Sequence, residues 1–293
     1  MRLRSALRLV AVLGLLGALL TTASPGSAAG TPTLQTGVVT FAQSNSATWY
    51  SVTFDEAFDD APIVVMGPIS YAGTHPAMMR VRNVTTTGFE YQLDEWEYLD
   101  GGHITDSATW VAAAPGEHDL RKMTGFATSI DLDHTWQSVS LGTGFDTAPV
   151  VFASVSSDND AAATVIRMRN VGTTSVDLRL QEEEAGDDIH GAETVHVLAF
   201  SEGSTTEDGL ALVVGRSGNE ATNAWYTVTG ARARGATGVL ADMQTFDGPD
   251  TAGVRYQNLS DDGVDLKIEE ETSGDSETSH TTEVLGWMLI TSW

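Results

Sequence analysis

The sequence predicts an all-β protein made of three tandem antiparallel β-sandwich units. A tryptophan-led segment recurs at Trp49, Trp136 and Trp225, with spacings of 87 and 89 residues. Apolar and polar residues alternate strictly in runs such as VDLRL at 176–180, which is typical of a strand with one buried face. Gly, Asp, Asn and Thr turns separate these short runs, and almost no segment has a helical period.

Each repeat contains the same predicted elements in the same order. After the tryptophan-led strand, an apolar run follows Ala-Pro at 61–62 and 148–149, where proline suits strand entry because no ladder donor is lost. An arginine-containing strand, an alternating strand and an apolar closing strand complete the unit. About six short strands per repeat favour a small sandwich. Propeller blades usually repeat at ~40 to 50 residues, and three blades would not close.

The repeats divide the chain into a leader and three units. The leader, 1–29, has three arginines, an apolar run at 9–20 and small residues at 24–30, which together predict a secretory signal peptide. An uncleaved anchor is the alternative. The predicted units are 30–118, 119–204 and 205–293, and no later segment is apolar enough to span a bilayer. We therefore expect a secreted, extracellular protein.

The composition limits the partners. The formal net charge is −25, the chain has no cysteine, and Lys122 and Lys267 are its two lysines. Such an acidic surface would repel nucleic acid and disfavours an anionic membrane. Neutral glycans, cations or a salt-rich medium suit this charge better.

Three short patterns per repeat resemble the H-type lectin domain. They are an F-x-x-A-P-x-V-V string, an arginine-containing strand that ends in G-F, and a terminal W-V-A. In the first unit these patterns occupy 58–65, 80–89 and 110–112; in the second they occupy 145–152, 167–176 and 197–199; the third unit carries them more weakly. The resemblance implies a six-stranded antiparallel sandwich that assembles as a trimer and binds galactose-type sugars. A triplicated chain can form such an assembly as an intrachain pseudo-trimer rather than a homo-oligomer.

The resemblance also implies ligand-facing residues. An aromatic–polar pair follows the G-F strand in that family, and Trp96 and Glu97 occupy those positions in the first unit. The pairs at the same positions of the other units are Glu183–Glu184 and Glu271–Thr272. Separately, Tyr71 lies in a loop at 70–75 whose counterparts are 156–160 and 245–250, and it offers an apolar platform for a sugar.

One glutamate per unit has the parity of the apolar strand face. A carboxylate at such a position needs a cationic or hydrogen-bonding partner, because an unpaired buried charge is costly. One arginine per unit recurs at a matching position and offers bidentate geometry. We interpret these residues as one internal ion pair per unit, with ligand binding as the alternative: Arg80–Glu95, Arg167–Glu182 and Arg255–Glu270.

An H-x-x-acid motif precedes each closing strand. The three copies are His103 with Asp106, His190 with Glu193, and His280 with Glu283. Three interpretations stay open for them: a loop histidine hydrogen-bonded to its local carboxylate, a metal site, or direct sugar contact. Imidazole with carboxylate suits a transition metal, whereas all-oxygen sites suit calcium, which the Asp-containing loops also allow.

The repeats favour a binding protein over an enzyme. Three equivalent carboxylate sets would mean three glycosidase sites in one small chain, whereas linked weak binding sites raise avidity. We therefore predict a non-catalytic, multivalent lectin-like protein whose partners are glycans or cell-surface polysaccharide. The alternative is an acidic structural or cell-surface-associated repeat protein that binds cations and no sugar.

Overall fold

The computed structural model describes residues 33–207, 209–229 and 235–292, and the predicted signal peptide at 1–29 lies outside them. The regular elements of these residues are strands, with no helix among them. Within the same residues no helix could cross a membrane. The predicted all-β class is confirmed.

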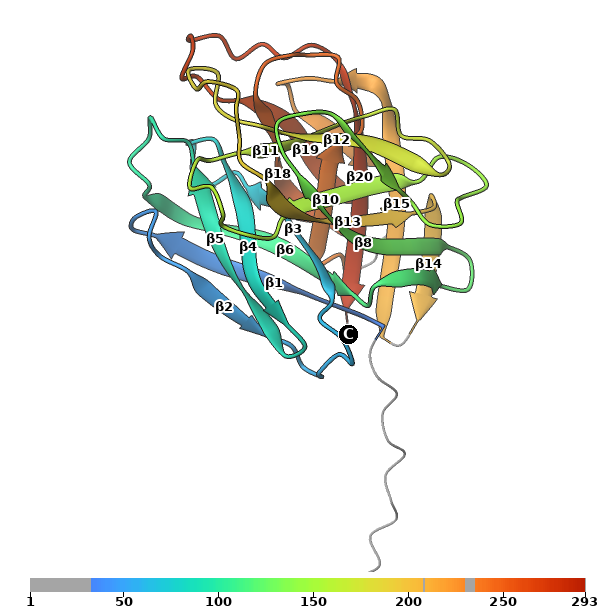
Figure 1. Cartoon of the computed structure of the whole chain (residues 1–293). Coiled ribbons are helices and arrows are strands. Elements are labelled where there is room, and N and C mark those ends of the chain that lie inside the picture. The colour runs from blue at the N-terminus through green and yellow to red at the C-terminus, as the bar shows by residue number, and fades with distance from the viewer. Residues whose placement is uncertain (1–32, 208, 230–234, 293) are drawn as a thin grey trace, which may run out of the picture. The chain divides into compact units, whose positions relative to one another are not determined.

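Figure 1 shows the strands of the described residues. The order of six of these strands recurs in each unit, and the second and third units each add one edge strand. In the first unit (34–113), β1 (Leu34–Gln43), β6 (His103–Ala113) and β3 (Ile63–Ser70) form one half of a six-stranded sheet that continues into the third unit. The second sheet of the first unit consists of β2 (Tyr50–Thr53), β5 (Gly88–Glu95) and β4 (Ala77–Thr85). In the second unit (116–200), the first sheet has the strand order β7 (Gly116–Asp119), β8 (Thr124–Leu132), β13 (Glu193–Phe200) and β10 (Val150–Val155). The second sheet of this unit has the order β9 (Gln137–Ser140), β12 (Ser175–Gln181) and β11 (Val165–Arg169). In the third unit (203–292), the first sheet is β14 (Gly203–Glu207), β15 (Leu210–Ala221), β20 (Glu283–Ser292) and β17 (Gly238–Met243). Its other three strands, β16 (Tyr226–Thr229), β19 (Gly263–Glu270) and β18 (Ala252–Ser260), form the second half of the six-stranded sheet.

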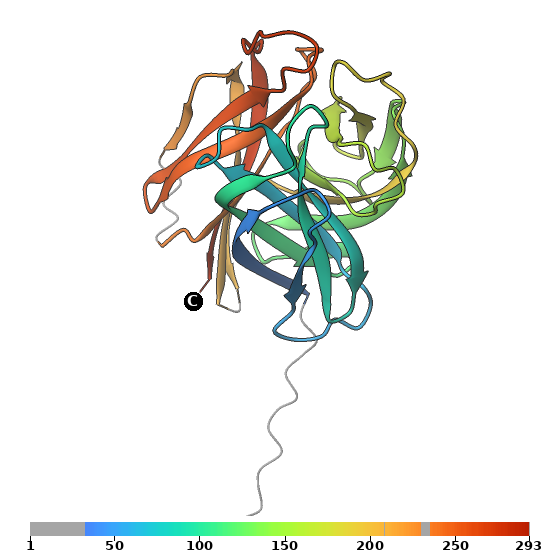
Figure 2. The same ribbon diagram turned by 90° about the vertical axis from the view of Figure 1, so that its left-hand side faces the viewer.

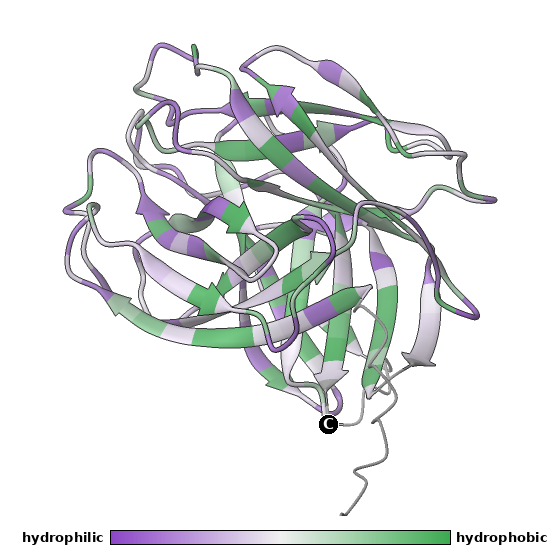
Figure 3. Ribbon diagram, turned by 60° about the horizontal axis from the view of Figure 1, so that its bottom comes forward, coloured by the Kyte–Doolittle hydropathy of each residue, from purple (hydrophilic) through white to green (hydrophobic). Residues whose placement is uncertain are grey.

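Each unit is a sandwich of two antiparallel sheets around its own apolar core. In the first unit that core includes Val81, Phe89 and Leu93 from β4 and β5, packed against Val64 and Ala112 from β3 and β6. The second and third units have cores of the same kind. Figure 3 shows hydrophobic and hydrophilic residues in bands along the strands. Along β12 and β19, buried apolar residues alternate with less buried polar ones, as a strand with one face on the core requires.

A further apolar core is shared by all three units. It contains Val111 of the first unit, Phe152 and Leu198 of the second, and Leu240 and Met288 of the third. The sheets that contain β6, β13 and β20 are therefore covered on both faces. This explains why the closing strands read as continuous apolar runs rather than as alternating ones.

The units contact one another in a closed cycle (Figures 1 and 2). One backbone N–H at an equivalent position in each unit donates to a side chain of another unit, at 2.9 Å. These bonds run from Val64 to His196 Nδ1, from Val151 to Gln244 Oε1 and from Val239 to Thr109 Oγ1. Burial lowers the pKa of His196 to about 4, so its ring stays neutral and Nδ1 can accept. A short parallel pairing of β3 with β18 also joins the first unit to the third.

The first residue of β19, Gly263, has no room for a side chain. Gly263 has φ +148°, and a Cβ there would lie 1.8 Å from the carbonyl oxygen of Val228 on β16. We expect Gly263→Ala to lower the free energy of unfolding by about 2 to 4 kcal/mol, measured by urea denaturation, because backbone atoms must move. The control is Gly253→Ala on β18, where a Cβ meets no atom within 4 Å. Equal losses in the two variants would contradict this account of Gly263.

Candidate functional site at the three junctions

One buried arginine per unit reaches out of its own unit into a loop of another. The arginines lie on β4, β11 and β18: Arg80, Arg167 and Arg255, each at most 2% exposed. We call the loops that they reach the junction loops; they are 157–162, 245–250 and 70–75 respectively. Arg80, for example, donates from Nη2 to the carbonyl of Asp160 at 2.6 Å and from Nε to that of Ser157 at 3.1 Å.

The other two junctions repeat this arrangement. Arg167 donates to the carbonyls of Gly248 (2.8 Å) and Asp250 (2.7 Å). Arg255 donates to those of Gly73 (2.8 Å) and His75 (2.9 Å). The second unit thus binds the third, and the third binds the first.

The acid of each H-x-x-acid motif is buried and accepts hydrogen bonds from its junction loop. Glu193 accepts from the Ser157 hydroxyl and from the backbone amides of Asn159 (3.0 Å) and Asp160 (2.7 Å), and it pairs with Arg80 Nη2 at 2.7 Å. Burial would raise the pKa of Glu193, but nearby His190, the hydroxyl and the backbone amides lower it to about 2. Asp106 and Glu283 bind their loops in the same way.

The motif histidines bridge two carboxylates. His103 lies 2.9 Å from Glu95 through Nδ1 and 2.8 Å from Asp106 through Nε2. Burial would lower the pKa of His103, but the hydrogen bonds to Asp106 and Glu95 raise it to about 8. At neutral pH the ring is therefore positively charged between two acids. His190 and His280 approach Glu182 (2.9 Å) and Glu270 (2.6 Å) through Nδ1 as well.

The predicted arginine–glutamate pairs within each unit are wrong. The glutamates are buried as expected, but Glu95, Glu182 and Glu270 pair with the histidines, while Arg80, Arg167 and Arg255 reach another unit. The strand register explains the difference: Arg80 lies opposite Gln92, whereas Glu95 lies opposite Ala77, three residues away. The arginine instead pairs with Asp94 at 3.3 Å.

The motif residues are also too buried for direct sugar contact. Their exposed fractions are 6% for His103, 2% for Asp106, 1% for His190, 0% for Glu193, 3% for His280 and 0% for Glu283. Of the three interpretations of the motif, the geometry matches the hydrogen-bonded loop histidine. These residues shape the junctions but present no surface to a glycan.

Trp96 cannot stack on a sugar as predicted, because it is only 2% exposed. It packs against Ala163 and Val165 of the second unit. A cavity of about 10 Å³ beside it has no room for a sugar ring. Glu97 is exposed, and it accepts from the Ala163 amide at 2.8 Å. Both residues therefore contribute to the contact between the first two units.

Aromatic clusters that were not predicted from the sequence lie at two junctions. Trp136 and Phe246 lie edge to face at 5.2 Å between ring centroids, with the guanidinium groups of Arg169 (4.1 Å) and Arg179 (5.4 Å) over the Trp136 ring. The aromatic rings come from different units and are partly exposed. An aromatic surface with charged neighbours can bind a ligand that has both apolar and hydroxyl faces.

The junction of the third unit with the first has the same cluster. Tyr71 and Trp225 lie edge to face at 5.3 Å, and Lys267 Nζ is 3.7 Å from the Tyr71 ring centroid. The prediction that Tyr71 contacts a ligand stays a prediction, and its partly exposed ring is compatible with it. The repeated tryptophans are the signal that could have located these clusters.

At the remaining junction the second aromatic ring is replaced by an acid. Arg82 lies 3.8 Å from the Trp49 ring centroid and pairs with Asp158 at 3.0 Å. Asp158 occupies the junction-loop position of Tyr71 and Phe246. The three junctions thus share one scaffold but differ in their outer chemistry.

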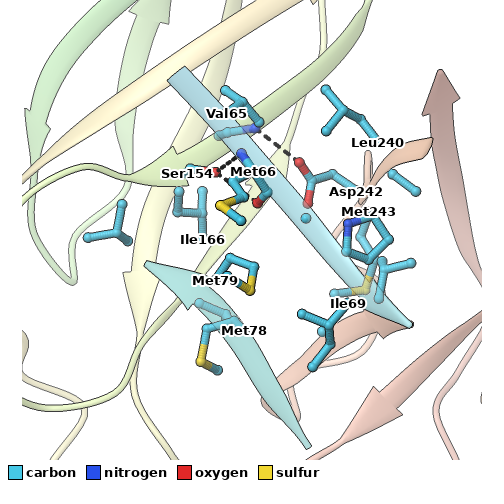
Figure 4. A pocket seen from close by; sticks show the side chains of 18 of the residues that line it. Val65, Met66, Ile69, Met78, Met79, Ser154, Ile166, Leu240, Asp242 and Met243 are labelled. Atoms are coloured by element: carbon cyan, nitrogen blue, oxygen red, sulfur yellow. Dashed lines mark hydrogen bonds between the residues drawn. The ribbon is translucent and has the colours of Figure 1, made fainter. Parts of the chain in front are cut away.

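A cavity of about 80 Å³ lies where β3, β10 and β17 meet (Figure 4). Its walls include Met66, Met79, Ile166 and Met243, and Asp242 is the one ionisable residue that lines it among the described residues. Burial raises the pKa of Asp242 to about 7, although its carboxylate accepts from the Ala153 amide at 3.0 Å. The cavity is too small and apolar for a sugar.

Two groups of described side chains bring together enough ligand atoms for a metal ion. They are His75, Glu95 and Asp100, and Asp160, Glu182 and His190, each with its ligand atoms within 4.8 Å of one another. Both groups include an imidazole, which distinguishes them from the all-oxygen sets that calcium prefers.

Parts of the chain are similar to known proteins. Residues 49–113 match the H-type lectin domain. Halomucin of Haloquadratum walsbyi is 26% identical over 216 residues, which cover 71% of this chain but 2% of halomucin. The chain therefore spans only a small part of the relative that it matches. No solved structure matches the chain.

Proposed function

We propose that the protein is a secreted, non-catalytic, multivalent carbohydrate-binding protein. The observation that carries this proposal is the match of residues 49–113 to the H-type lectin domain, in a chain folded into antiparallel sandwiches. In the proposal all three repeats are units of this kind, packed as an intrachain pseudo-trimer. The predicted boundaries at 118/119 and 204/205 fall inside β7 and β14, so each later unit would begin at the start of these strands.

The proposed sugar sites are the aromatic clusters of the junctions. An exposed aromatic face packs against the C–H groups of a sugar ring, while charged neighbours bond its hydroxyl groups. Trp136 with Phe246 and Trp225 with Tyr71 offer both components. Two linked sites on one chain would raise avidity for a repetitive polysaccharide. The strongly acidic surface favours neutral over anionic glycans.

We expect Trp136→Ala and Trp225→Ala each to weaken binding to an immobilised neutral glycan by about tenfold or more. The reason is that each change removes the larger ring of one proposed site. A glycan array would identify the ligand, and surface plasmon resonance would measure the loss.

The matched control is Trp49→Ala, which removes the equivalent tryptophan at the junction without a second ring. We expect it to change affinity much less, and circular dichroism would verify that all three variants fold. An array on which the unmodified protein binds no glycan would refute the function. Equal losses in all three variants would refute the location.

A further inference from the structure

We propose that His75, Glu95 and Asp100 form a binding site for a divalent transition metal of the zinc class. His75 comes from the junction loop after β3, Glu95 is the last residue of β5, and Asp100 lies in the loop that follows β5. One ligand atom of each residue lies within 4.8 Å of the others. This inference goes beyond glycan binding and does not depend on it.

One carboxylate oxygen of Glu95 has no hydrogen-bond partner among the described residues. The Glu95 side chain is 0% exposed, and its Oε1 is bonded to His103. Its Oε2 is buried and has no hydrogen-bond partner among the described residues. Buried carboxylate oxygens are normally satisfied, so this one points to a missing ligand atom or ion.

A second imidazole, that of His75, lies beside the same carboxylate. The His75 side chain is 47% exposed, and its Nδ1 lies 3.4 Å from Glu95 Oε1. Because His103 already satisfies that oxygen, His75 is not needed to neutralise Glu95. The His75 carbonyl accepts from Arg255 at 2.9 Å, which holds the loop in place.

Asp100 completes the set from the opposite loop. It is exposed, and its Oδ1 accepts from the Gly102 amide at 3.0 Å, which orients the side chain. One imidazole nitrogen and two carboxylates, with an open side for water, are a ligand set that Zn²⁺ accepts. The imidazole disfavours Ca²⁺ and Mg²⁺.

The other two units can be compared with the first at the position of His75. The positions of His75 in the other units are Ala162 and Asp250, so neither places an exposed imidazole beside its glutamate. In the second unit the imidazole of the other group belongs to His190, which is 1% exposed and bonded to Glu182. Glu270 Oε2 of the third unit is also buried without a hydrogen-bond partner, but Asp250 rather than a histidine stands beside it. Among the described residues, the first unit alone therefore combines such an oxygen with an accessible histidine at this position.

The test is a zinc titration of the purified, chelator-treated protein by isothermal calorimetry, without any glycan. We expect one Zn²⁺ site that weakens at least tenfold in His75→Ala. Long-range ¹H–¹⁵N spectra of the histidines should show Zn²⁺ shifting a ring nitrogen of His75. Asp100→Asn, an exposed change that leaves the buried Glu95–His103 pair intact, should also weaken the site.

The control is His134→Ala, which removes another histidine that is not buried. It should leave this zinc site unchanged. Zinc affinity that is the same in His75→Ala and the unmodified protein would overturn the proposal. So would a titration that shifts other histidines and leaves His75 unmoved, and neither result would bear on glycan binding.

Discussion

The change Arg80→Met is expected to lower the free energy of unfolding by about 3 to 5 kcal/mol. Arg80 joins two units by pairing with Glu193 and by donating to carbonyls of the 157–162 loop. Methionine fills similar space but leaves Glu193, which is 0% exposed, without its cationic partner. Losing one member of a buried pair is costly because the other charge stays buried. Urea denaturation at neutral pH measures the loss.

The matched control is Arg82→Met, two residues along the same strand. Arg82 also pairs with an acid of the second unit, Asp158, but its side chain is 30% exposed. Solvent screens such a pair, so the expected loss is no more than about 1 kcal/mol. Similar losses in the two variants would show that burial does not set the strength of this junction.

The second large effect concerns pH and Asp242. The pKa of this residue rises from its ordinary 3.8 to about 7 in the folded protein, because burial in the apolar cavity disfavours the charged form. The folded protein therefore holds a proton that the unfolded chain has released between these two values. The contribution of Asp242 is fully present below pH 4 and is lost as the pH rises through 7. Because the Asp242 residue is partly exposed, the loss by pH 8 is at most about 4 kcal/mol.

We expect Asp242→Asn to remove this loss. Asparagine stays neutral and keeps an oxygen for the Ala153 amide. The stability of the variant relative to the unmodified protein should rise between pH 4 and pH 8, measured by urea denaturation at each pH. Other titrating groups, such as Asp94 and Glu193, are common to both proteins and cancel in the difference. A difference that does not vary with pH would contradict the proposed burial of Asp242.

The strands could be predicted from the sequence, but the contacts between the sheets of different units could not. Alternation along 176–180 gave the correct buried face, because a strand's side chains follow a period of two. The closing strands carry no alternation because the shared core covers their second face. A continuous apolar run indicates burial, but the neighbours that cover it belong to other units.

The same limit explains the errors in the candidate site. The parity of Glu95 with the apolar face of its strand correctly predicted that this carboxylate is buried. Parity does not give the direction in which a long side chain extends, and Arg80 crosses to the second unit. The family resemblance placed Trp96 at a ligand, but Ala163 and Val165 of the second unit cover its ring. The partners of Trp136 and Trp225 also come from distant segments.

The closed cycle of junctions has a consequence for how the chain becomes a folded protein. Stacked repeat proteins grow by adding neighbours and need special end repeats to cover their exposed faces. Here Arg255 of the third unit holds the 70–75 loop of the first, so neither end of the array is left uncovered. During synthesis, a chain that has completed two units still lacks part of the shared apolar core. The strands of the third unit therefore complete the contacts of the first, and the shared apolar surface stays partly uncovered until all three units have folded.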